Sequence, residues 1–212
     1  MVEDITPEQV KKILVDIILS TQEEQWKKLA PEKKARLNAI EKKCGLKNGY
    51  GKIIYVQRKY KGLDTYKHFG IYIGRFHVIH NATDDDSKDS KKAYVHETDI
   101  FQFTNGDEFG FLGKKELSEY MHAAEYLSET QEPFLPTANK FEIFSSEQTI
   151  LNAKSKLGER NYHLFHNNCE HFATWCKTGI PFSFQVELLK KSLQKLSESE
   201  SGQLVMSVIG SF

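Results

Sequence analysis

Between Lys52 and His80 apolar residues recur at alternate positions, and this pattern constrains the fold more than any other feature of the chain. A period of two is typical of β-strands that bury one face. The stretches KIIYVQRKY and HFGIYIG predict successive strands, and RFHVIH, after Gly74-Arg75, predicts the returning arm of a hairpin. We therefore expect an antiparallel sheet.

Helical patterns precede and follow these strands, which predicts an α+β fold. The segment TPEQ at residues 6–9 offers a capping threonine, a proline and a capping-box glutamine, so a helix is expected to begin there. Its expected inner face consists of Val10, Ile13, Leu14, Ile17 and Ile18. A second helix is expected over residues 31–44, with inward-facing Leu37, Ile40 and Cys44. Together they predict a helical hairpin packed on the main domain.

The rest of the chain divides at polar stretches and turns. Residues 81–92 lack the spacing of a calcium-binding loop and predict a solvated loop, and YVHETDIFQF after them predicts one or two strands. Helices are expected over residues 114–129, 146–157 and 185–198. We thus expect a helical extension at 1–47, a main domain at 48–190, and a charged helix end with a short apolar tail at 191–212.

Composition narrows the class of protein. The 29 basic and 29 acidic side chains balance, which argues against a nucleic-acid partner, because such a partner selects a basic surface. There is no apolar run of about 18 residues, and the charged N-terminus does not resemble a secretory signal. Three cysteines without an export signal argue against a disulfide framework. We therefore expect a cytoplasmic protein, including a peripheral location on membranes.

Cys169 lies where a cysteine is expected to be reactive. The residues before it, YHLFHNN, have no helical pattern, whereas EHFATWCKTG after it predicts a helix that ends at Gly179. Cys169 is therefore expected at a helix N-terminus, with Asn168 as the N-cap. Unpaired amides and the positive end of the helix dipole stabilise a thiolate there, and the same amides can bind an oxyanion. This position predicts a nucleophile.

A cysteine nucleophile needs a base, and the chain has eight histidines. His171 is close in sequence, but on a helix it lies about 200° around the axis from Cys169 and cannot easily meet it. His166 precedes the helix, and nothing else in its surroundings favours it. The two histidines of the hairpin, His68 and His80, are the better candidates.

Whether these two histidines can meet depends on the turn of the hairpin. Two residues on opposite strands whose numbers are both even, such as His68 and His80, lie on the same face of the sheet only if the loop has an odd number of residues or if a bulge intervenes. A three-residue loop at 73–75 places His68 opposite His80, and a loop one step later places them diagonally. A two-residue loop at Gly74-Arg75 sends them to opposite faces.

If the two imidazoles share a face, one takes the proton from the thiol and the other holds it in the correct tautomer. The alternative is that both are strand histidines with satisfied hydrogen bonds. A metal site is a further alternative, based on four residues of zinc-ligand types: His166, Cys169, His171 and Cys176. Their spacing matches no common zinc pattern, and helical geometry turns His171 away from the two cysteines. We expect no metal, no cofactor, and a core position for Cys176.

Three segments in this order, YKHFGIYIG, VIH and NYHLFHNNCEHF, resemble the lecithin:retinol acyltransferase family. This family includes small phospholipase/acyltransferases and is related to bacterial NlpC-type peptidases. The resemblance covers residues 48–190, including SSEQTILNAKSKLGE before the cysteine and GIPFSFQV after it. It implies a permuted papain-like α+β fold, with the catalytic cysteine at Cys169, the base at His68 and the supporting polar residue at His80.

The resemblance also implies a reaction. An acyl chain would pass from a glycerophospholipid, through a thioester on Cys169, to retinol, an amine or water, so a phospholipid substrate and a transient membrane contact are expected. No protein partner of residues 1–47 is indicated. An NlpC-type peptidase or amidase and a non-catalytic binding protein on the same fold remain the alternatives. The chain departs from the family pattern at Phe69, where Trp or Tyr is common, and at Lys52, where the family has an acidic residue.

Overall fold

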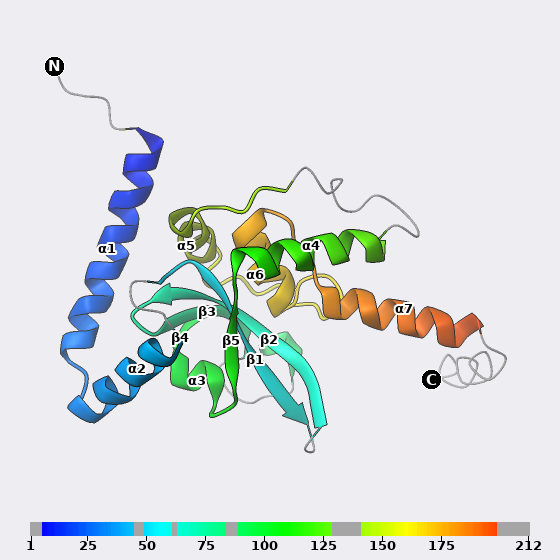
Figure 1. Ribbon diagram of the computed structural model, residues 1–212, viewed down its shortest axis with the longest axis horizontal. Coiled ribbons are helices and arrows are strands. Elements are labelled where there is room, and N and C mark those ends of the chain that lie inside the picture. Colours follow the sequence, from blue (N-terminus) through cyan, green and yellow to red (C-terminus); the bar gives the residue numbers. More distant parts are fainter. Residues whose placement is uncertain (1–5, 45–48, 61–62, 84–88, 129–140, 199–212) are drawn as a thin grey trace.

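A five-stranded sheet lies at the centre of the molecule, in a computed structural model that describes residues 6–44, 49–60, 63–83, 89–128 and 141–198 (Figure 1). The strand order is β4-β3-β2-β1-β5, and all neighbouring strands are antiparallel. The strands are β1 (Lys52–Tyr60), β2 (Leu63–Gly74), β3 (His77–Ala82), β4 (Tyr94–Asp99) and β5 (Phe109–Leu112). The helices are α1 (Pro7–Lys27), α2 (Pro31–Cys44), the 3-10 helix η1 (Ser90–Lys92), α3 (Ile100–Thr104), α4 (Lys114–Ser128), α5 (Ser146–Ser155), α6 (Cys169–Thr178) and α7 (Phe184–Glu198). The predicted α+β fold with an antiparallel sheet is confirmed.

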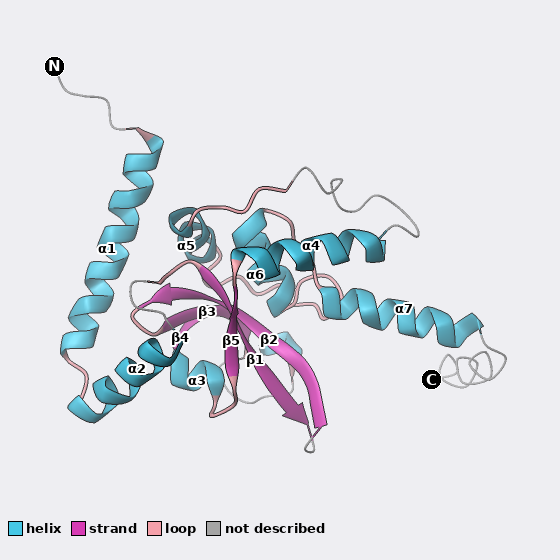
Figure 2. Cartoon of the chain, viewed as in Figure 1, coloured by secondary structure: helices cyan, strands magenta, loops and turns pink. Residues whose placement is uncertain are grey.

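Helices cover both faces of this sheet (Figure 2). One core lies between the sheet and helices α4, α5 and α6; it contains Ile53, Phe69, Ile71, Ile73, Ile79, Leu117, Met121, Ile150, Ala153, Phe172, Ala173 and Cys176. A second core lies between the sheet and helices α2 and α3; it contains Leu37, Ile54, Val56, Tyr72, Phe76, Val78, Ile100 and Phe103. Successive residues of β2 thus enter different cores, as the period of two predicts.

The first helix begins where expected, but it packs through another face. The side chain of Thr6 accepts a hydrogen bond from the Gln9 amide and completes the predicted capping box. Four residues of the expected inner face are between 43% and 58% exposed: Val10, Ile13, Leu14 and Ile17. Val15 is buried instead, with Ile18 and Leu19 beside it, because this neighbouring stripe contacts the first core.

The predicted inner face of α2 is present at Leu37 and Ile40. Leu37 is 1% exposed, and Ile40 packs partly buried against the second core. The side chain of Cys44 and the apolar tail at 199–212 lie outside the described residues. The division of the chain at 47/48 and 190/191 stays a prediction; Val15 and Leu37 join the cores of the main domain, and α7 crosses the second boundary. Among the described helices, none is long and apolar enough to span a membrane.

Two elements after the hairpin differ from the sequence-based expectation. The segment IFQF is a helix rather than a strand, because the Asp99 carboxylate accepts hydrogen bonds from the amides of Phe101 and Gln102 at 2.9 and 3.0 Å. The segment FGFL forms β5, which the pattern does not predict, and it pairs with β1 from Ile53 to Val56.

The turn of the β2–β3 hairpin has two residues. Gly74 pairs with His77, and the turn residues Arg75 and Phe76 both have left-handed backbone conformations, with φ of 43° and 68°. Positive φ at both turn positions is typical of the type I′ turn, whose twist matches that of a hairpin. A regular ladder continued from this turn would send the two histidines to opposite faces.

A bulge between Tyr72 and Gly74 prevents that outcome. It shifts the register by one residue, so that Tyr72 lies opposite Val78. With this register His80 falls beside Gly70, diagonally across from His68 and on the same face of the sheet. The bulge therefore places the two histidines on one face of the sheet, although the turn itself has an even number of residues.

Candidate active site

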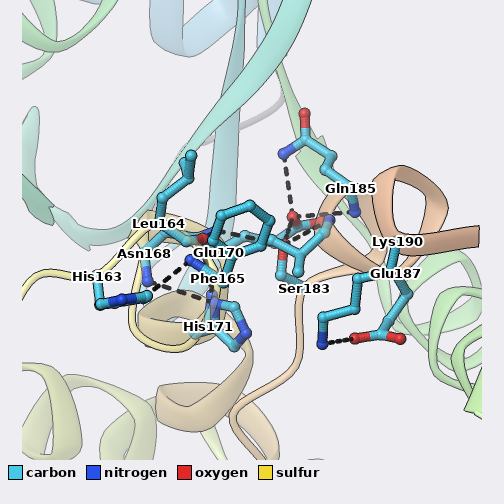
Figure 3. A network of polar contacts seen from close by, with 11 residues as sticks. His163, Leu164, Phe165, Asn168, Glu170, His171, Ser183, Gln185, Glu187 and Lys190 are labelled. Carbon is cyan, nitrogen blue, oxygen red and sulfur yellow. Dashed lines mark hydrogen bonds and ion pairs between the residues drawn. The ribbon is translucent and has the colours of Figure 1, made fainter. Parts of the chain in front are cut away.

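Cys169 is the first residue of α6, and Asn168 is its N-cap, as predicted. The Asn168 Oδ1 accepts hydrogen bonds from the amides of Glu170 and His171 at 2.9 and 3.1 Å. Its Nδ2 donates to the carbonyl of Leu164 at 2.8 Å, which ties the preceding loop to the helix (Figure 3). The cap fixes the thiol at the end of the helix where the amides point outward.

The two histidines nearest to Cys169 in sequence have other contacts. His171 belongs to the cap of α6: its Nδ1 lies 3.3 Å from the Asn168 backbone nitrogen and 2.9 Å from Asn168 Oδ1, and its tautomer decides which atom it binds. Burial lowers the pKa of His171 to about 4. His166 is exposed and stacks on His163, with ring centroids 4.7 Å apart.

His68 and His80 are hydrogen-bonded to each other, with 2.7 Å between Nε2 of His68 and Nδ1 of His80. They are 7% and 6% exposed. The ring of Phe103 lies against both, at 5.3 Å between centroids in each case. A Cβ atom at Gly70 would lie 2.7 Å from the Val78 side chain and 3.0 Å from the Phe103 ring. The glycine thus leaves the space in which the three rings pack.

Helix α6, which begins at Cys169, packs against β2. The backbone amides of Phe69, Glu170 and Cys169 each lower the pKa of the thiol. Phe69 directly follows His68 on β2, so the amide that acts on the thiol belongs to the stretch of strand that carries the imidazole. The structure joins His68 to His80 by a hydrogen bond and packs α6 against β2, while the catalytic roles of Cys169, His68 and His80 stay a prediction.

Burial decides the protonation states of these groups. It raises the pKa of the Cys169 thiol to about 11, against the amides and the charge of Arg58. It lowers the pKa of His68 to about 3, with Arg58 and His96 acting in the same direction, and it lowers the pKa of His80 well below its usual value. The expected thiolate is therefore not the resting form: the helix amides act as predicted, but desolvation is the larger effect. The resting pair is a neutral thiol and a neutral imidazole.

The hydrogen bond between the histidines defines which nitrogen can act as a base. If His68 Nε2 carries the proton and donates to His80 Nδ1, then His68 Nδ1 is left to accept a proton. His80 then carries its own proton on Nε2, an atom that is buried without a hydrogen-bond partner among the described residues. In this arrangement His80 holds His68 in the tautomer that a base requires.

Arg58 is a site residue that the sequence analysis misses. Its guanidinium donates to the carbonyls of Phe103 and Thr104 at 2.7 and 3.0 Å and forms an ion pair with Asp107 at 3.1 Å. These bonds hold the end of α3 against the histidine pair. One signal was available: alternation from Ile54 places residue 58 on an inward-facing position of β1, where an arginine needs a buried acceptor.

Acidification is expected to destabilise the protein through its buried histidines. The pKa of His68 is about 3 when folded and 6.5 ordinarily, so between these values only the unfolded chain binds the proton. The free energy of unfolding therefore falls as pH decreases below about 6.5, by up to about 1.4 kcal/mol per pH unit for each such histidine. Urea unfolding at pH 7.5, 6.0 and 5.0 measures this slope. His68→Asn should flatten it, and an equal slope in this variant would contradict the assignment.

The second cysteine of α6 has a structural place. Cys176 is fully buried in the first core, as predicted, and burial raises its pKa well above the usual value. Within the described ranges, no group of three or more histidine, cysteine, aspartate or glutamate side chains is arranged to hold a metal ion.

Comparison with known proteins identifies the family. The family model described as lecithin retinol acyltransferase matches residues 47–182. The lecithin retinol acyltransferase of Bos taurus is 26% identical over 155 residues, which cover 68% of this chain and 62% of that protein. The proteins of the same name from Rattus norvegicus and Homo sapiens are 35% and 32% identical over 65 residues, or 31% of this chain and 28% of theirs. The chain thus spans about three fifths of its bovine relative. Because the family model matches more than half of the sequence, over a range that contains His68, His80 and Cys169, the chain belongs to the lecithin retinol acyltransferase family.

Proposed function

We propose that this protein is an acyl-transfer enzyme that carries a fatty acyl chain as a thioester on Cys169 and takes it from a glycerophospholipid. The supporting observation is the hydrogen-bonded pair of His68 and His80, together with a cysteine at the start of α6 whose pKa is lowered by the amide of Phe69, the residue after His68. A nucleophile, a base and an orienting group are the components that covalent acyl transfer requires. The family supports the reaction class, since the curated relatives are named as acyltransferases.

In the first step, Nδ1 of His68 takes the thiol proton as the Cys169 sulfur attacks the ester carbonyl carbon. The carbonyl electrons move to oxygen, and the amides at the start of α6 and of Phe69 are the donors available to that oxyanion. When the tetrahedral intermediate collapses, the bond between the acyl carbon and the ester oxygen breaks. The leaving lysophospholipid takes the proton from His68.

In the second step, an alcohol, an amine or water gives a proton to His68 and attacks the thioester. The bond between the acyl carbon and sulfur breaks, and the proton returns from His68 to Cys169. His68 is cationic only during transfer, when its contact with His80 stabilises it. A pair that rests in its neutral form is suited to this sequence.

Exposed apolar side chains near the site favour a lipid over a peptide as the substrate. Tyr66, two residues before His68, is 50% exposed, and Leu164, whose carbonyl binds the cap of α6, is 54% exposed. Leu188 of α7 is 45% exposed, and the first turn of that helix contacts β2. Such side chains are suited to contact with the acyl region of a membrane surface. We infer that they touch the bilayer while an acyl chain is withdrawn.

The direct test is the mass of the intact protein after incubation with phosphatidylcholine vesicles. A mass increment equal to one fatty acyl group, mapped to Cys169, is the expected result, together with lysophospholipid in the supernatant. Because fast deacylation can hide the adduct, lysophospholipid and fatty acid are measured in the same samples.

Two other outcomes would reject the proposal in favour of its alternatives. Cleavage of peptidoglycan fragments, with no product from phosphatidylcholine, identifies a peptidase or amidase. An unlabelled Cys169, with no lysophospholipid, no fatty acid and no peptide cleavage, identifies a binding protein on the same fold.

A further inference from the structure

The start of α6 lies where β2 and β3 separate. The described ladder between these strands ends at Ile71 and Ile79, although β2 itself extends further. Beyond this point the same edge of β2 faces helices α6 and α7, since the Phe69 amide lowers the pKa of the Cys169 thiol and Lys67 binds Gln185. The contacts along this edge therefore set the position of the thiol relative to His68.

Gln185, in the first turn of α7, occupies the next position along the same edge. Its Oε1 accepts a hydrogen bond from the Lys67 amide at 2.7 Å, and its Nε2 donates to the Lys67 carbonyl at 3.0 Å. These two bonds are of the kind that a neighbouring strand would make. Lys67 directly precedes His68, so Gln185 holds the stretch of backbone that carries the imidazole.

A buried carboxylate joins Gln185 to the nucleophile helix (Figure 3). Glu170, 1% exposed, directly follows Cys169. Its Oε2 accepts hydrogen bonds from the Gln185 side-chain and backbone nitrogens, at 3.0 and 3.3 Å, and from the Ser183 hydroxyl. Burial raises the pKa of Glu170, and its Oε1 has no hydrogen bond within the described chain. An apolar side chain would avoid this desolvation cost, so stability alone does not account for the carboxylate.

We propose that Glu170 and Gln185 are positioning residues that hold the Cys169 sulfur at the separation from His68 that proton transfer needs. The proposal rests on the function proposed above. Covalent bonds and hydrogen bonds run from Cys169 through Glu170, Gln185 and Lys67 to His68, and the proposed proton transfer between His68 and Cys169 would close this path into a ring. Without this ring, α6 can shift along the open edge of β2. A displacement of about 1 Å between reacting groups costs roughly 100-fold in rate.

Alanine substitutions test the ring with two rates. Glu170→Ala and Gln185→Ala are each expected to lower the alkylation of Cys169 by iodoacetamide, and the formation of its acyl adduct, by about 100-fold. Glu170→Gln keeps an acceptor oxygen for the same donors and should stay within about threefold of the unmodified protein. Gln57→Ala is the matched control. The side-chain Nε2 of Gln57 also donates to the backbone of β2, at 3.3 Å from the Tyr66 carbonyl, but Gln57 lies on β1.

A charge rearrangement separates positioning from general stability. Gln185→Glu sets a second carboxylate against Glu170; the two share a proton at low pH and repel each other once both are ionised. Its rate relative to the unmodified protein is therefore expected to fall as pH rises. The double variant Glu170→Gln with Gln185→Glu restores a single carboxylate and should remove that dependence. Urea unfolding of each variant measures any loss of folded protein.

The outcomes distinguish this inference from the function on which it rests. Folded Glu170→Ala and Gln185→Ala variants that alkylate at the unmodified rate would overturn the positioning role. Slow alkylation of these variants, in a protein that forms no acyl adduct and releases no lysophospholipid or fatty acid, supports the positioning role and rejects acyl transfer. A pH profile of Gln185→Glu that parallels that of the unmodified protein also counts against the ring.

Discussion

Replacing Cys169 by alanine is expected to remove the acyl adduct and to lower lysophospholipid release by about 10⁴-fold or more, because the proposed nucleophile is lost. The measurement is intact mass after incubation with phosphatidylcholine vesicles, with lysophospholipid determined in parallel. The fold should persist, since Cys169 is a small side chain at the end of α6 and the cap is made by Asn168.

The control for this variant lies on the same helix. Cys176 is buried in the first core, so Cys176→Ala changes the thiol content equally but removes no site residue. The adduct and the rate should both remain in Cys176→Ala once the folded fraction is taken into account. Lysophospholipid release that survives in Cys169→Ala would contradict the proposed nucleophile.

The second large effect is expected at the histidine pair. His68→Gln removes the base and should lower the rate by about 10²- to 10⁴-fold. His80 acts through His68, by accepting a hydrogen bond from His68 Nε2. This role predicts different results for two variants of His80. His80→Leu leaves that donor without an acceptor and should cost about 10²-fold or more, whereas His80→Gln keeps an acceptor oxygen and should retain a larger share of the rate.

Rates of lysophospholipid release over a range of pH provide the measurement. Equal rates for His80→Leu and His80→Gln would show that the hydrogen bond to His68 does not matter. A rate for His68→Gln close to that of the unmodified protein would remove His68 from the mechanism altogether.

The surroundings of Cys169 could be predicted because their signals are local. An asparagine before the helix and a glycine after it define α6 within a few residues, and both caps are present in the structure. The thiol pKa could not be predicted in the same way. It depends on how deeply the helix end is covered, and burial of Cys169 reverses the direction that the helix amides alone would give.

The relation between His68 and His80 could be narrowed but not decided from the sequence. The even separation of the two histidines was compatible with several turn lengths. The outcome depends on a bulge next to Gly74, which no residue type in the sequence predicts. A bulge is a property of the pairing between two strands, so it becomes visible only when both are in place.

Glu170 and Gln185 were missed for a related reason. An acidic residue in the first turn of a helix is common at exposed sites, where the helix dipole stabilises it, so Glu170 had an ordinary explanation. Only the packing of α7 across the open edge of β2 buries it. The segment IFQF forms a helix instead of the expected strand because the Asp99 side chain caps it, an effect that apolar alternation does not include.

The two N-terminal helices complete the cores on both faces of the sheet, through Val15 and Leu37. The free energy that keeps the thiol helix and the histidine strands together therefore comes partly from side chains that no substrate reaches. Truncating a buried leucine such as Leu37 costs about 2–5 kcal/mol, against a total of about 5–15 kcal/mol for a typical domain. Variation in this region would change how many molecules are folded in a cell, while each folded molecule kept its turnover. The phenotype of such variants would reflect a smaller amount of folded protein, with the activity of each folded molecule unchanged.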